Sequence, residues 1–448
     1  MMWAFLPLFL AIVGIIVLTS RWKWHPFLAL IVVSIGFGWA VGMPSAAILK
    51  ALQEGFGGTL GAIGIIIVAG LIIGTFLEQS GGAQVIAQFF IRKLGGKRIH
   101  WVMGCIGYLV SIPVFADSGF VILSPLNKAL TKKVGVSLAG TAIALSMGLT
   151  GAHTMVPPTP GPIAATAIIG ADLGLVIVFG LLASSIGLSV CILFAKFMGS
   201  RIWIAPKVDA HPTAETTPEY LPTLGRTLLP ILVPIGLIVC NSVVSYPGFP
   251  IQEGTLKNSI AFVGHPIIAL FIGVFLALFV PKKWDGQRLT QEGWLGMAVK
   301  GAATILLITA AGGAFGKVIQ SSGIHHNIEP LLKDLPLGLI LPFLLAALIK
   351  TAQGSSTVAI VTAASLALPM LEVLGLTAAF DKALVVVAIG AGSAVVSHAN
   401  DSFFWVVTQF SQMSIPQGYR LHTLASLILG ISALTTLYCI KGVLSLFF

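Results

Sequence analysis

Residues 112–120 read Ile-Pro-Val-Phe-Ala-Asp-Ser-Gly-Phe, and they place a carboxylate, Asp117, inside an otherwise apolar run. Basic residues close this run, at Lys97 and Arg98 before it and at Lys128, Lys132 and Lys133 after it. The stretch between them is short for two full crossings of a bilayer, since one helical span needs about 20 residues. A single crossing would leave one basic flank outside the cell, against the preference of Lys and Arg for the cytoplasm. We therefore expect a re-entrant hairpin that enters from the cytoplasm, turns near mid-membrane and returns.

The carboxylate of Asp117 is the reason to favour the hairpin over the alternative, a single long, tilted helix with Asp117 near the lipid headgroups. An ionisable group inside a membrane is costly, and by default it marks a pathway or a binding site. Non-helical backbone at that depth is tolerated only where it lines a cavity or is buried in protein. The stretch thus predicts a turn that faces an internal cavity.

The composition is that of a polytopic membrane protein. Of the 448 residues, 56% are hydrophobic and 9% are charged, and the mean hydropathy is +1.00. The net charge of +10 does not indicate nucleic-acid binding, because the basic residues fall in short loops where they set the topology. The four cysteines are scattered without metal-ligand spacing, so we expect no disulfide framework, no metal site and no cofactor. The first apolar span has no basic n-region and no cleavage site, which predicts a retained helix.

Hydropathy divides the chain into two halves, 1–198 and 226–448, joined by a polar cytoplasmic linker at 199–225. Membrane segments are expected at 2–19, 27–43, 59–78, 136–155, 173–198, 226–245, 260–280, 301–320, 336–372, 383–396 and 420–446, with an amphipathic surface helix at 83–95. Most basic residues fall in loops assigned to the cytoplasm, whereas Lys50, Lys257, Lys333 and Lys382 are assigned to the outside. Both termini are therefore predicted to be periplasmic.

An internal repeat relates the two halves. The octet Gly-Thr-Phe-Leu-Glu-Gln-Ser-Gly at 74–81 resembles Gly-Lys-Val-Ile-Gln-Ser-Ser-Gly at 316–323, an offset of 242 residues. Each octet precedes a polar-centred hairpin and then a broken helix with a histidine, His153 or His398. The first half makes an odd number of crossings, so the second half is expected to be inverted. The predicted fold is all-α, with two inverted-topology repeats that each contain a re-entrant hairpin and a broken transmembrane helix, the arrangement of secondary transporters with a midplane site.

Several motifs resemble those of the gluconate permease family, and together they cover essentially the whole chain. They are Gly-Gly-Thr-Leu-Gly at 57–61, Val-Pro-Pro-Thr-Pro-Gly-Pro at 156–162, Gly-Ala-Asp-Leu-Gly at 170–174, Gly-Gly-Ala-Phe-Gly at 312–316, Gly-Ser-Ser-Thr-Val-Ala at 354–359 and Asn-Asp-Ser-Phe-Phe-Trp at 400–405. The resemblance implies a proton-coupled importer of gluconate or a related small sugar acid in the bacterial inner membrane, and a homodimer. It leaves open other family substrates, such as D-serine, glycerate or a ketogluconate, and sodium coupling.

Four polar islands would converge if the halves fold as inverted repeats, and free backbone N–H groups at the helix breaks would favour an anion. Hydroxyl and amide groups there suit a polyhydroxy acid. The residues expected to bind substrate are Ser118, Gly119, His153, Thr154, Lys350, Gln353, Gly354, Ser355, Ser356, Thr357, His398, Asn400 and Ser402.

The candidate proton carriers are Asp117 and Asp401, because a low-dielectric environment favours the neutral form of a carboxyl group. Asp401 has an alternative role as the N-cap of a helix that begins near Ser402. Lys350 has two interpretations: an ion pair with the substrate or with an acid of the site, or extension of its ammonium group to the membrane interface. His153 and His398 are candidate proton relays, although each is also a common structural residue.

Two other classes of protein fit the sequence less well. An intramembrane hydrolase would use Ser118 or Ser355 with a histidine base, but no Gly-x-Ser-x-Gly nucleophile motif is present and the repeat has no role in that interpretation. A channel needs a continuous polar pore rather than polar islands. ATP-driven transport is not indicated, since the chain has no phosphate-binding loop of the form Gly-x₄-Gly-Lys-Ser/Thr. The chain is therefore predicted not to be an enzyme.

Overall fold

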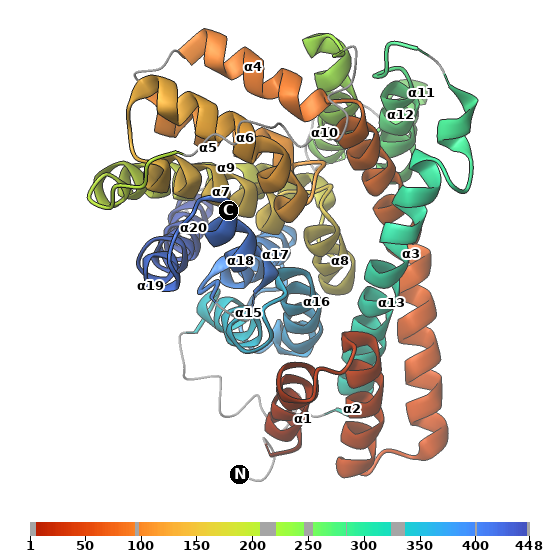
Figure 1. The fold of residues 1–448 in the computed structure, drawn as a ribbon. Coiled ribbons are helices and arrows are strands. Elements are labelled where there is room, and N and C mark those ends of the chain that lie inside the picture. The colour runs from red at the N-terminus through yellow and green to blue at the C-terminus, as the bar shows by residue number, and fades with distance from the viewer. Residues whose placement is uncertain are drawn as a thin grey trace.

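The computed structural model describes residues 6–94, 98–206, 221–245, 254–283, 285–323, 337–398 and 401–445, and this part of the chain is all-helical. Figure 1 shows α3 (Ser45–Gln79) and α13 (Trp294–Ser321) side by side along one flank, with α1 (Leu6–Ile16) and α2 (Pro26–Ala40) near one end of them. The remaining hairpins and broken helices gather beside this pair, and their ends meet in the interior. The expectation of an all-α protein is confirmed.

In the first half, α1 continues as the π-helical turn η2 (Val17–Arg21), and α2 and α3 follow it. The other elements of this half are α4 (Gly82–Leu94), α5 (Ile99–Ser111), α6 (Ala116–Val134), α7 (Leu138–Met155), α8 (Pro160–Ile169) and α9 (Leu173–Gly199). In the second half, α13 follows α10 (Leu224–Val244), α11 (Thr255–Val263), α12 (Pro266–Leu278) and η4 (Gly286–Leu289). After α13 come α15 (Ile340–Gln353), α16 (Ser356–Ala367), η5 (Leu368–Met370), α17 (Ala379–Ala394), α18 (Ser402–Phe410), α19 (Ile415–Gly418), η6 (Tyr419–Thr423) and α20 (Leu424–Leu444).

The helix lengths fit a multi-pass membrane protein. Within the described residues, four helices are long and apolar enough to cross a membrane: α9, α10, Gly286–Ser321 and Ile415–Leu444. The number rises to six if two bent pairs each count as one span. One is α3, bent by 44° around residue 63, and the other is α11 with α12, bent by 60°.

Several predicted boundaries were wrong where polar residues continue a helix. The span expected at 59–78 is the second part of α3, which begins at Ser45 and therefore includes Lys50, a residue assigned to a loop. Lys50 lies 3.8 Å from Glu54 one helical turn on, a spacing that supports a helix. Lys257 and Lys382 likewise lie in helices, α11 and α17. Lys333 lies outside the described residues, as does most of the linker.

Helical hairpins form at both polar-centred stretches. In the first, α5 and α6 are joined by residues 112–115, and Phe115 has extended backbone at the start of α6. In the second, α15 ends at Gly354, whose φ of +89° favours glycine, and the hydroxyl of Ser355 accepts a hydrogen bond from Val358 N. A helix is present at the position predicted for the surface helix, as α4, and Asp172 caps α9 by accepting a hydrogen bond from Leu175 N.

The helices of the two halves follow the same order at the predicted offset. Adding 242 to Gln79, the end of α3, gives Ser321, the end of α13, and adding it to Pro160, the start of α8, gives Ser402, the start of α18. The pairs α5 and α15, and α7 and α17, correspond within a few residues. Contacts also cross between the halves, since α6 packs on α18 and α8 packs on α16.

The equivalent helices α3 and α13 run antiparallel. Gly55 lies against Ala314, whereas Gly64, further along α3, lies against Leu306, which comes earlier in α13. Their backbones are close because both helices carry glycine at the contact. A Cβ atom on Gly313 would lie 1.9 Å from Thr59 Oγ1, and a Cβ atom on Gly55 would lie 2.5 Å from the carbonyl oxygen of Gly313. Small residues allow this approach between membrane helices.

Candidate functional site

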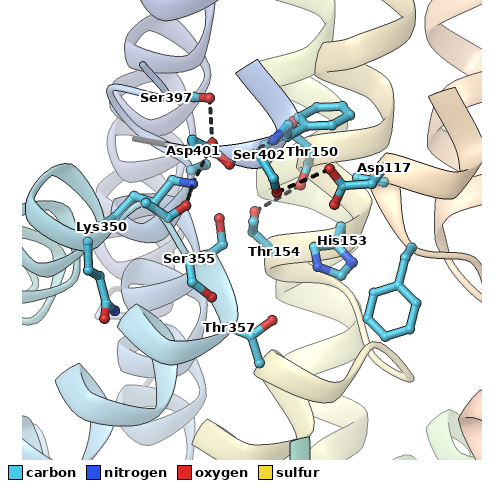
Figure 2. A pocket seen from close by; sticks show the side chains of 17 residues that line it. Asp117, Thr150, His153, Thr154, Lys350, Ser355, Thr357, Ser397, Asp401 and Ser402 are labelled. Carbon is cyan, nitrogen blue, oxygen red and sulfur yellow. Dashed lines mark hydrogen bonds and ion pairs between the residues drawn. The ribbon is translucent and has the colours of Figure 1, made fainter. Parts of the chain in front are cut away.

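A cavity of about 300 Å³ lies where the hairpins and broken helices of both halves end. Figure 2 shows Lys350 and Asp401 on one side of it and Asp117 and His153 on the other. The lining residues are Phe115, Ala116, Asp117, Thr150, His153, Thr154, Lys350, Gln353, Gly354, Ser355, Ser356, Thr357, Ala394, Ser397, Asp401, Ser402 and Phe403. Residues from the two halves, more than two hundred positions apart in sequence, thus share one cavity.

Among the described residues, three helices begin at this cavity. The first turns of α6, α16 and α18 contribute Ala116, Ser356 and Ser402 to its lining. The first N–H groups of a helix have no partner within that helix, and the aligned peptide dipoles place partial positive charge at the N-terminus. The three N-termini therefore make the cavity favourable for an anion.

A buried ion pair lies on one side of the cavity. Lys350 Nζ lies 2.6 Å from Asp401 Oδ2 and also donates a hydrogen bond to the carbonyl oxygen of Gly354. Both side chains are almost fully buried, at 3% and 7% exposure. One interpretation of Lys350 from the sequence was an ion pair with an acid of the site, and the structure has this pair. The other interpretation, extension of the ammonium group to the membrane interface, does not hold in this conformation.

Asp401 is surrounded by donors. In addition to Lys350, its Oδ2 accepts a hydrogen bond from Ser397 Oγ at 2.5 Å, and its Oδ1 accepts one from the backbone N–H of Phe403 at 3.0 Å. The last contact is the helix cap that the sequence suggested for Asp401. Three donors, one of them cationic, stabilise the ionised carboxylate.

Asp117 has a different environment. Its Oδ1 accepts a hydrogen bond from Ser402 Oγ at 3.4 Å, and among the described residues it forms no ion pair. The bond joins α6 of the first half to α18 of the second (Figure 2). One long hydrogen bond leaves most of the acceptor capacity of this carboxyl group available to a proton or to a ligand.

Two buried polar atoms of the lining residues lack a hydrogen-bond partner. They are Nδ1 of His153, at the end of α7, and Nε2 of Gln353, at the end of α15. Leaving a buried polar atom unpaired is unfavourable, so such atoms are uncommon and call for a partner. Both belong to residues predicted from sequence to contact a substrate, and they come from opposite halves.

Hydroxyl groups complete the lining. Ser355, Ser356 and Thr357 follow one another at the start of α16, and Figure 2 shows Ser355 and Thr357 beside the open space. Thr154 Oγ1 donates to the carbonyl oxygen of Thr150 one turn earlier in α7, at 2.9 Å. Because its proton is used in this bond, the Thr154 hydroxyl can only accept a hydrogen bond from a ligand.

Some predicted site residues lie elsewhere. Ser118 and Gly119 sit in the first turn of α6 but do not line the cavity, and a Cβ atom on Gly119 would lie 2.7 Å from Leu149 Cδ2 of α7. His398 lies outside the lining, and its Nε2 is 2.8 Å from the carbonyl oxygen of Thr351. The offset of 242 would place His153 at position 395, so the two histidines are not equivalent. Asn400 lies outside the described residues.

Sequence reasoning missed several residues that line or support the cavity. Phe115, Thr150 and Phe403 neighbour predicted residues, and Thr150 lies one helical turn before Thr154. Ser397 belongs to the predicted break but was not selected. His422, which lies 3.0 Å from Ser397 Oγ, gave no signal, since a histidine at the start of an apolar span is most often a polar end residue. The described residues contain no group of three His, Cys, Asp or Glu side chains placed to hold a metal ion.

The fold and the cavity define a class of protein, a multi-pass helical membrane protein whose interior holds a polar site of small-molecule size.

A family profile described as GntP family permease matches residues 3–443. A gluconate permease of Pseudomonas aeruginosa is 34% identical over 440 residues, which cover 97% of this chain and 96% of that protein. The Gnt-II system L-idonate transporter of Escherichia coli is 31% identical, covering 98% of this chain and all of that protein. The D-serine transporter DsdX of Escherichia coli is 32% identical, covering 99% of each. The chain therefore belongs to the GntP family of permeases and is a transporter, not an enzyme.

A solved structure supports the fold. The chain resembles the YdaH transporter of Alcanivorax borkumensis with a TM-score of 0.64, and the match covers 93% of this chain and 98% of that one. The sequences are 17% identical, so this likeness concerns the fold alone.

Proposed function

We propose that this permease imports gluconate or a related small sugar acid across the inner membrane together with protons. The observation that carries the proposal is the cavity shared by both halves, in which Lys350 and three helix N-termini surround a polar space. A carboxylate ligand fits the partial positive charge at the three helix N-termini. The ligand's hydroxyl groups fit the unpartnered His153 Nδ1 and Gln353 Nε2 and the hydroxyls of α16.

The two carboxyl groups divide the coupling function between them in this proposal. Asp401 is held ionised by Lys350 and Ser397, so it acts as the fixed counter-ion of the lysine. Asp117 has no cationic partner among the described residues and faces the same cavity, so it is the group that loads and releases the proton. Neutral Asp117 removes a negative charge from the site and so favours the substrate anion, which couples the two binding events.

The two halves are proposed to be inverted repeats, with residues 1–198 and 226–448 on either side of a cytoplasmic linker at 199–225. The common offset of the helices and the antiparallel packing of α3 on α13 support this. The hairpins α5–α6 and α15–α16 are proposed to be re-entrant, since each places its turn and polar residues at the internal cavity. Periplasmic termini and a homodimer complete the proposal.

A zwitterionic amino acid such as D-serine is the second candidate substrate. One relative is a D-serine transporter, and the Asp117 carboxylate lies in the same cavity as the anion-favouring helix N-termini. An ammonium group would then bind Asp117 while the carboxylate occupies the lysine side of the site.

The deciding experiment uses the purified full-length protein in proteoliposomes, with gluconate, L-idonate and D-serine as radiolabelled probes. An inward proton gradient should drive accumulation of a sugar acid, and an inward sodium gradient at equal pH should not. Accumulation of D-serine alone would favour the second candidate. Accumulation driven by sodium alone would refute proton coupling, and movement of none of the probes under either gradient would refute the proposed function.

A further inference from the structure

A segment outside the cavity contacts all three polar atoms of one residue that lines the cavity. The segment is the π-helical turn η6 with the first turn of α20, and the residue is Ser397 in the break after α17. The Ser397 backbone N–H donates to Ser426 Oγ at 3.1 Å, and its carbonyl oxygen accepts from Thr423 Oγ1 at 2.5 Å. Its hydroxyl oxygen lies 3.0 Å from His422 Nε2.

We propose that this segment, with His422 as its central group, is a positioning device for the Lys350–Asp401 pair, acting through Ser397. The inference rests on the proposed function for its consequence in transport, but the contacts that carry it do not. His422 is fully buried and does not line the cavity, and within the described part of the chain its hydrogen-bond route to the ion pair runs through the serine hydroxyl.

The direction of the hydrogen bonds follows from counting protons. Ser397 has one hydroxyl proton, and an ionised Asp401 can only accept, so that proton points to Asp401 Oδ2 at 2.5 Å. The Ser397 oxygen must then accept from His422, which fixes the imidazole as the tautomer with its proton on Nε2. His422 thereby prevents the serine hydroxyl from turning away from the carboxylate.

The other neighbours of the imidazole keep it in place without competing for that proton. Its Nδ1 lies 3.4 Å from Ser146 Oγ of α7, and the rings of Phe403 and Phe404 of α18 pack at 5.6 and 6.1 Å between centroids. The charged groups that act on it are Asp401 and Lys350, both at the cavity. A buried histidine that is fixed in one tautomer can orient the hydroxyl group of Ser397.

The backbone at the break after α17 also needs to be held in place by its surroundings. Val396, next to Ser397, has a φ of +51°, a conformation that is strained for a β-branched residue. Strained residues persist where the surrounding structure over-determines them, and they concentrate at functional sites. The hydrogen bond that Thr423 donates to Ser397 and the one that Ser426 accepts from it supply that constraint. Single π-helical turns are themselves frequent at functional sites.

The test compares two substitutions of His422 that differ in whether an N–H donor remains at the position of Nε2. The amide nitrogen of glutamine occupies the place of Nε2, whereas that of asparagine occupies the place of Nδ1. His422→Gln should therefore preserve the bond to Ser397 and His422→Asn should lose it. Thr436→Val is the matched control, because Thr436 is a buried hydroxyl of α20 whose bond, to Ser432 O at 2.8 Å, stays within its own helix.

Two measurements on full-length protein in liposomes decide the matter. The first is the infrared carboxylate band of Asp401, recorded with ¹³C-labelled aspartate and assigned as the band that Asp401→Asn removes. This band should shift in His422→Asn and in Ser397→Ala. It should stay in place in His422→Gln and in the control Thr436→Val. The apparent KM for gluconate should rise about tenfold in His422→Asn with a maximal rate within about twofold, because the Ser397 hydroxyl is then no longer held in its hydrogen bond to the charged Asp401 carboxylate. The double variant His422→Asn with Ser397→Ala should add little to either effect.

An unchanged carboxylate band in His422→Asn would overturn the positioning role whatever the transport result. Equal shifts in the Gln and Asn variants would also overturn it, since packing of the ring rather than the Nε2 donor would then be responsible. If the wild type moves no gluconate, the proposed substrate fails, and the infrared comparison still decides the role of His422.

Discussion

Lys350 Nζ and Asp401 Oδ2 lie 2.6 Å apart inside a membrane protein, with 3% and 7% of their side chains exposed. Lys350 comes from the end of α15 and Asp401 from the start of α18, so the pair ties a hairpin to a broken helix. Such a pair contributes little net stability, but removal of one partner leaves an uncompensated buried charge. The pair is therefore a sensitive point for both stability and transport.

The first prediction separates these two roles. Lys350→Met should destabilise the protein by about 3–5 kcal/mol because Asp401 stays buried and charged, and it should abolish gluconate uptake. The double variant Lys350→Met with Asp401→Asn should regain most of the thermal stability, because no lone charge remains, and should still fail to transport. Unfolding in detergent and uptake in proteoliposomes measure the two effects. Uptake restored by the double variant would show that the lysine charge does not bind substrate.

The second prediction concerns the glycine contact between α3 and α13. Gly313→Val should lower the stability by more than about 2 kcal/mol, because its Cβ atom alone would lie 1.9 Å from Thr59 Oγ1 and the helices would have to separate. Gly301→Ala, in the same helix with open space around it, should change stability by less than about 1 kcal/mol. Equal thermal unfolding of the two variants would mean that this contact is not a close one.

The third prediction tests α16 as part of the binding site. Ser356 lines the cavity, and its hydroxyl donates to the carbonyl oxygen of Ser393 at 3.0 Å. Ser356→Leu should block gluconate uptake by filling the cavity, with the protein still folded by its thermal transition. Ser356→Ala removes the hydroxyl without adding volume and should reduce uptake less. Normal uptake by the leucine variant would remove this helix start from the substrate path.

The fourth prediction concerns orientation in the membrane. In a variant with its native cysteines replaced by serine, a cysteine at Thr255 should react with an impermeant reagent from the periplasmic side, and one at Gln287 should not. Both side chains are exposed in the fold, so access depends on the side of the membrane. The reverse labelling pattern would invert the proposed topology.

The sequence carried enough information to predict the helix breaks, because proline, glycine and clustered polar residues interrupt apolar runs. Asp117, His153 and Gln353–Thr357 were predicted on that basis and line one cavity. The partner of Lys350 stayed open, because two residues 51 positions apart pair only when α15 and α18 are placed in space. His422 was missed for the same reason, since its importance lies in a contact with Ser397 and not in its own neighbours along the chain.

The helix boundaries that were predicted wrongly have a different cause. A hydropathy pattern marks where a helix is apolar and not where it ends, so the polar first turns of α3 and α11 were assigned to loops. Ser118 and Gly119 were included as neighbours of Asp117, although on a helix adjacent residues point in different directions.

The fifth prediction is that Asp117 carries the proton that accompanies the sugar acid. The measurement is proton uptake into proteoliposomes driven by an inward gradient of gluconate, read with an internal pH dye. The wild type and the control Asp172→Asn, which keeps an exposed helix cap, should acidify the interior. Asp117→Asn should exchange labelled gluconate across the membrane and produce no acidification. Gluconate-driven acidification by Asp117→Asn at the wild-type rate would contradict the account.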